Sequence, residues 1–109
     1  MTGFDDRRAA FENKFKHDEE KLFKINVRTS KIFGLWAAEH LNFLDKEAEA
    51  YADTVVEADF EEPGFEDVIR KVAADFKDKK LDISMETMYE ELEKAQGKAE
   101  EQVSTGDAA

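Results

Sequence analysis

Apolar residues recur with a helical period through most of the chain. Between residues 45 and 61 they fall three or four positions apart, so they share one face of a helix, and only Asp59 interrupts that face. Asp45 comes first and is a candidate N-cap, because its side chain can accept hydrogen bonds from the free N–H groups of a first turn. Pro63 cannot continue a helix interior but suits the first turn of the next helix. The pattern predicts a helix over residues 45–61.

Two later segments show the same period. In residues 64–80, Glu66 and Asp67 lie near the start and three lysines, Lys77, Lys79 and Lys80, lie near the end, which matches the helix macrodipole. A short link leads to Ser84, a candidate N-cap for a further helix over residues 84–101. Such short links favour antiparallel neighbours, and the sequence has no Asn-Gly or Asp-Gly hairpin turn that would indicate strands.

The first part of the chain carries one long helical stripe whose apolar density changes along its length. From Leu22 onward large apolar residues are frequent, and we expect a core helix over residues 20–42. Residues 1–19 are expected to form an amphipathic extension that cannot bury its own phenylalanines. After Met1, the large apolar residues of this extension are Phe4, Phe11 and Phe15.

Together these segments predict an all-α protein, a four-helix bundle with a mobile, amphipathic N-terminal extension. We expect residues 1–19 to be partly disordered in the free protein and residues 20–103 to form the bundle. The small polar residues 104–109 are expected to form a frayed tail.

Composition excludes several classes of protein. The chain has 109 residues and a mass of 12.5 kDa, which is enough for one domain. It has no cysteine, so disulfide scaffolds, thiolate nucleophiles and zinc fingers are excluded. No apolar run approaches the roughly 20 residues that a membrane-spanning helix needs, and the N-terminus lacks the apolar core of a secretory signal.

Charge is distributed unevenly along the chain, whose formal net charge is -11. Residues 1–34 hold eight basic and six acidic residues, whereas residues 35–109 hold eight basic and 21 acidic ones. The acidity argues against nucleic acid or an anionic membrane as partner, and it disfavours self-association, so we expect a monomer in the free protein. Residues 1–34 thus carry both signs of charge in similar number. They form either a partner-binding element or only a solvated helix with internal ion pairs such as Glu12–Lys16 and Glu20–Lys24.

Signals for catalysis are weak. His17, Asp18 and Glu19 are consecutive, so on a helix they point about 100° apart and cannot converge on one ion. His40 ends an apolar run and is interpreted as a boundary residue. There is no HExxH motif, no glycine-rich phosphate loop and no Glu-x-x-His pair for a bundle metal site. We therefore expect a binding protein rather than an enzyme, with no metal and no cofactor. Weak adenine-nucleotide binding to a bundle face stays open, although no motif supports it.

Three blocks of this sequence resemble the alphaproteobacterial ATPase inhibitor zeta subunit family, and the likeness follows nearly the whole chain in order. The first block is Phe4-Asp5-Asp6-Arg7 with Ala10-Phe11-Glu12-Asn13-Lys14-Phe15 and His17-Asp18-Glu19-Glu20. The second is Gly34-Leu35-Trp36-Ala37-Ala38-Glu39. The third is Ala58-Asp59-Phe60-Glu61-Glu62-Pro63-Gly64 with Glu66-Asp67-Val68 and Arg70-Lys71-Val72.

The resemblance implies a four-helix bundle that binds the F1 sector of the F-type ATP synthase and blocks ATP hydrolysis. It implies that the N-terminal segment, about residues 1–19 here, is the inhibitory element and becomes helical on entering a catalytic interface between the alpha and beta subunits near gamma. It also implies a cytoplasmic protein that is associated with the membrane peripherally, through F1.

Helical geometry adds an interpretation of individual residues in this segment, which we call the inhibitory arm (residues 1–19). The arm has an apolar face that the rest of the chain is not expected to cover. Such a helix is suited to binding in a groove of a partner protein. We expect the apolar anchors to be Phe4, Phe11 and Phe15, and the polar contacts to be Asp5, Asp6, Arg7, Arg8 and Lys14. The alternatives are a generic bundle that docks other proteins through its acidic faces and a nucleotide-responsive regulator without F1 specificity.

Overall fold

The residues that the structure describes fold into four helices, as predicted. The computed structural model describes residues 2–60 and 64–104, with side chains described for residues 19–60 and 64–103. The described part contains no strand. The helices are α1 (Thr2–His40), α2 (Lys46–Asp59), α3 (Glu66–Asp78) and α4 (Met85–Ser104). Each of the three shorter helices lies within three residues of its predicted bounds at both ends.

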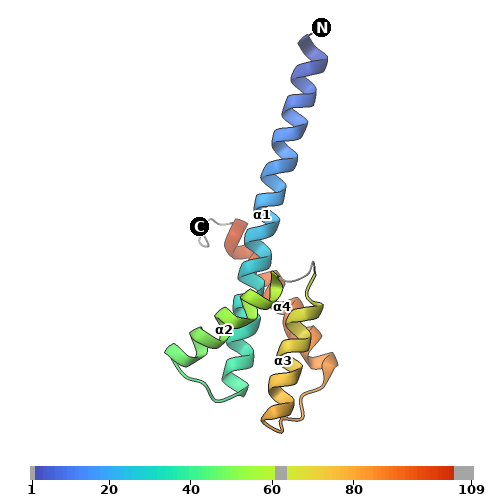
Figure 1. Ribbon diagram of the computed structural model, residues 1–109. Helices are drawn as coiled ribbons and strands as arrows, with labels where there is room; N and C mark the ends of the chain where they lie inside the picture. The colour runs from blue at the N-terminus through green and yellow to red at the C-terminus, as the bar shows by residue number, and fades with distance from the viewer. Residues whose placement is uncertain (1, 61–63, 105–109) are drawn as a thin grey trace.

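Helix α1 is the centre of the arrangement. Helices α2 and α4 both pack along its C-terminal half, whereas α3 contacts α2 more extensively than it contacts α1 or α4 (Figure 1). The N-terminal half of α1 projects beyond the other three helices, and the longest dimension of the molecule is 66 Å. α1 has no break at residue 19, the predicted end of the inhibitory arm. The mobility of that arm in the free protein and the division into domains remain predictions.

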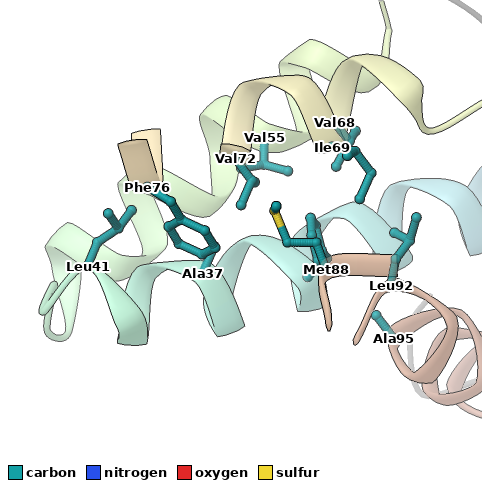
Figure 2. Packing of buried hydrophobic residues seen from close by; sticks show 11 residues of the cluster. Ala37, Leu41, Val55, Val68, Ile69, Val72, Phe76, Met88, Leu92 and Ala95 are labelled. Atoms are coloured by element: carbon teal, nitrogen blue, oxygen red, sulfur yellow. The ribbon is translucent and has the colours of Figure 1, made fainter. Parts of the chain in front are cut away.

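The hydrophobic core lies where the C-terminal half of α1 meets the other three helices. Phe33 and Phe76 are fully or almost fully buried, and Trp36 joins them, with its ring centroid 5.4 Å from that of Phe33 and 5.7 Å from that of Phe76. Trp36 is partly buried and packs against the core cluster. Figure 2 shows the side chains that converge from the four helices. The buried cluster comprises Phe33, Ala37, Leu41, Val55, Val68, Ile69, Val72, Phe76, Met88, Leu92 and Ala95.

The two predicted N-caps have different outcomes. The backbone N–H of Thr87 donates a hydrogen bond of 3.1 Å to the Ser84 hydroxyl, so Ser84 caps α4 as predicted. Asp45 stands at the N-cap position of α2 but makes no capping hydrogen bond with its side chain. Its φ is 50°, in the left-handed region, whereas an N-cap residue normally has extended backbone angles. The prediction for Asp45 was therefore wrong.

A glycine allows α1 and α2 to pack closely. A Cβ atom at Gly34 would lie 2.8 Å from the Cα of Ala52, 3.1 Å from its Cβ and 3.2 Å from the Cβ of Val55. The first of these distances is too short for any real Cβ contact. Ala52 is itself fully buried. The glycine in the second sequence block thus fixes how closely the two helices approach, and with it the position of α2 on α1.

Candidate partner-binding surface

The residues predicted to bind a partner all lie in the first half of α1. The backbone is helical from Thr2. Their side chains lie outside the described part of the structure, so their roles as anchors and polar contacts remain predictions. They are Phe4, Asp5, Asp6, Arg7, Arg8, Phe11, Lys14 and Phe15.

A second apolar surface lies where the projecting half of α1 meets the bundle. Leu22 and Phe23 are each 57% exposed, and Phe60, just after the end of α2, is 58% exposed. The rings of Phe23 and Phe60 stack with their centroids 5.8 Å apart. We call Leu22, Phe23 and Phe60 the junction patch. The sequence prediction placed Leu22 in a core helix, and the structure leaves it largely in solvent.

Basic side chains flank the junction patch. Lys21, Lys24 and Arg28 are exposed on the same stretch of α1. A hollow of about 180 Å³ is lined by Phe23, Lys24, Val27 and Arg28. The Arg28 Nε donates a hydrogen bond to the Gln102 side chain of α4. This part of α1 therefore combines apolar and basic side chains, with Glu19 and Glu20 exposed just before them.

Asp59, which interrupts the apolar face of α2, lies beside the buried hydroxyl of Ser30 on α1. Thr29 and Ser30 are both fully buried, and the Thr29 hydroxyl donates a hydrogen bond of 2.7 Å to the Ile25 carbonyl. The Ser30 hydroxyl faces the Asp59 carboxyl, but it does not reach ordinary hydrogen-bond geometry with any described group. Burial raises the pKa of Asp59 above its usual range, and Ser30 offsets part of that increase.

A polar cluster joins α2 to α3. The Tyr51 hydroxyl donates a hydrogen bond of 2.7 Å to the Asp75 carboxylate, and the Lys71 ammonium lies 3.0 Å from the same oxygen. Lys71 also lies 5.0 Å from the centre of the Tyr51 ring. Burial, followed by the hydrogen bond to Asp75, raises the pKa of Tyr51, so it stays protonated. We interpret this cluster as a link between helices, because each of its charges is paired.

The described residues bear on the catalytic and metal-binding patterns considered in the sequence. They include no group of three or more His, Cys, Asp or Glu side chains arranged to hold a metal ion. His40 packs against aromatic rings, 4.7 Å from Trp36 and 6.2 Å from Phe76 between centroids, which fits its interpretation as a boundary residue. Within the same residues, none of the helices is both long enough and apolar enough to cross a membrane.

A separate hollow of about 260 Å³ lies between α1 and α4. Trp36 and Leu35 line it from α1, and Lys94 and Lys98 line it from α4. Lys94 is already paired with Glu91, at 3.2 Å. Weak nucleotide binding to a bundle face remains a prediction.

Comparison with known proteins agrees with the fold and with the three sequence blocks. A family model described as ATPase inhibitor subunit zeta matches residues 1–102. The comparisons with curated proteins and with solved structures gave no match. The matched region contains the inhibitory arm, the core of the bundle and most of α4, and an inhibitor subunit is a regulatory protein rather than a catalytic one. The chain therefore belongs to the ATPase inhibitor subunit zeta family.

Proposed function

We propose that this protein inhibits ATP hydrolysis by the F1 sector of the F-type ATP synthase. In this proposal the inhibitory arm enters a catalytic interface between the alpha and beta subunits, next to gamma, and stops rotation in the hydrolytic direction. The observation that carries the proposal is the match to an ATPase inhibitor family over residues 1–102. The projection of the first half of α1 away from the bundle supports it (Figure 1).

The amino-acid pattern of the inhibitory arm suits a helix that binds in a groove. Positions 4, 11 and 15 are spaced by seven and four residues, so they fall on one side of an α-helix. Aromatic anchors in a groove of the partner would supply most of the affinity, and the charged residues between them would set the register. Any ordering of the arm on binding costs conformational entropy, so a few strong anchors are needed.

The bundle serves as a scaffold in this proposal. Every residue of the buried cluster lies between Phe33 and Ala95, so the described core draws on no residue of the inhibitory arm. In this proposal the arm binds a partner while the buried cluster stays packed. We propose that the protein acts in the cytoplasm as a non-enzymatic monomer and reaches the membrane only through F1.

The proposal is tested by measuring ATP hydrolysis by purified F1 with added full-length protein or protein lacking residues 1–19. We expect the full-length protein to inhibit and the truncated protein to lose inhibition. The truncated protein should keep its helical circular dichroism and unfold cooperatively, because the core cluster is retained. Full inhibition by the folded, truncated protein would refute the mechanism, and no inhibition by the full-length protein would refute the function.

A further inference from the structure

We propose that the junction patch is a second contact surface for the ATPase, beside the groove that receives the inhibitory arm. The partner surface would be apolar with acidic residues around it. This inference rests on the proposed function, since it takes F1 as the partner, but it concerns residues that lie outside the inhibitory arm. It assigns a binding role to Leu22, Phe23 and Phe60.

Exposure is the first argument. All three side chains of the junction patch are more than half exposed, and all three are large and apolar. By contrast, Ile25 and Phe33, further along the same helix, are 7% and 0% exposed. Grouped apolar side chains that a bundle leaves in water mark a surface that another molecule covers.

The patch is held in place before any partner arrives. Phe23 lies on α1 and Phe60 follows α2, and their stacked rings join the two helices. The α1–α2 contact below them is fixed by the close approach of Gly34 to Ala52. Side chains that are already positioned lose less conformational entropy on binding, which favours their use as anchors.

Continuity with the inhibitory arm indicates which partner covers the patch. Leu22 is seven positions after Phe15, so the two positions fall on the same side of α1. A partner that holds the predicted anchor at Phe15 would meet Leu22 two turns later, at the edge of the bundle. The patch therefore extends the predicted arm surface onto the bundle.

Charge indicates the chemistry of that partner surface. Lys21, Lys24 and Arg28 are exposed beside the patch, and the hollow of about 180 Å³ has both aromatic and basic walls. Such a surface fits apolar side chains surrounded by carboxylates. A second copy of this chain is a poorer partner, because each copy carries a net charge of -11.

The test uses full-length protein and purified F1. Phe23→Ala and Phe60→Ala, alone and combined, remove the stacked pair, and Leu44→Ala is the matched control because Leu44 is 76% exposed in the α1–α2 link. We expect the concentration for half-inhibition of ATP hydrolysis to rise at least tenfold for the double variant and less than twofold for Leu44→Ala. Thermal unfolding of each variant confirms that it remains folded at the assay temperature.

A charge reversal gives an independent measurement. We expect Lys24→Glu to raise the half-inhibitory concentration several-fold at low salt, with a smaller effect at high salt, since screening weakens the interaction. Lys77→Glu, on the exposed face of α3, is the control and should change it little. Wild-type inhibition in the same assay establishes the proposed function separately.

Three results would overturn the proposal. One is inhibition by the folded Phe23→Ala/Phe60→Ala variant at the wild-type concentration. Another is an equal loss for Leu44→Ala. The third is concentration-dependent dimerisation in sedimentation that disappears in the double variant while inhibition is retained, because the patch would then contact a second copy rather than F1.

Discussion

Substitution of Gly34 by alanine tests the packing of α1 against α2. The added Cβ would lie 2.8 Å from the Cα of Ala52, which is backbone and cannot rotate away, and 3.2 Å from Val55 Cβ. The helices must therefore separate or slide. Overpacking costs about 1–3 kcal/mol, and a contact with backbone places this case near the upper end. Alanine in place of glycine stabilises a helix by about 1 kcal/mol through its higher helix propensity, so we expect the free energy of unfolding to fall by about 2 kcal/mol in total.

Gly97 provides a matched control, because it lies within α4 and an added Cβ there would meet nothing within 4 Å. Gly97→Ala should therefore gain about 1 kcal/mol from helix propensity alone. For a domain of this size each kcal/mol shifts Tm by roughly 4–8 °C. Gly34→Ala should thus unfold roughly 8–16 °C below the wild type, and Gly97→Ala roughly 4–8 °C above it.

The assay is unfolding by heat and by urea, followed by far-ultraviolet circular dichroism on both variants and the wild type. The reasoning requires shifts of opposite sign for the same chemical change. A Gly34→Ala protein as stable as Gly97→Ala would show that α1 and α2 separate at little cost. Close helix approach would then not explain the glycine at position 34.

Two further predictions concern a helix cap and a partly buried acid. Ser84→Ala removes the acceptor of the Thr87 N–H and should cost about 1 kcal/mol in urea unfolding, and an unchanged stability would contradict the cap assignment. Burial raises the pKa of Asp59 in the folded state, so the protonated carboxyl favours folding over the charged one. The stability that this gives is fully present below the unfolded pKa of about 3.9 and is lost as pH rises through the folded pKa. Asp59→Asn should therefore be more stable than the wild type at pH 7, with the difference shrinking toward pH 4, and a difference that does not change with pH would refute the assignment.

The sequence predicted the helices and most of their ends, because each signal is local. The link before α4 ends at Ser84, whose hydroxyl needs only the N–H groups of the next turn, and the cap is present. Asp45 carried a similar local signal, yet the turn between α1 and α2 imposes a φ of 50° there. The path that connects two packed helices determined that angle, and a residue's capping preference cannot reveal the path.

Part of the candidate binding surface was likewise predictable from the sequence, and part was not. The segment that resembles an inhibitory element is recognisable because its apolar spacing and its motif lie in consecutive residues. The exposure of Leu22 and Phe23 was not predictable, since frequent apolar residues normally indicate a core. One signal was present for Phe23, which lies about 100° from Leu22 and about 160° from Ile25 around the helix.

The sequence by itself determined the all-α class, the helical segments, the uneven charge and the family, because periodicity, composition and motifs are properties of neighbouring residues. The tertiary structure alone decided which apolar residues are buried, how closely Gly34 lets α2 approach, and that Phe23 stacks on Phe60. Burial depends on residues distant in the chain that reach the same place. A helix presents its apolar residues on a face, and only the helices packed against it decide how much of that face is covered.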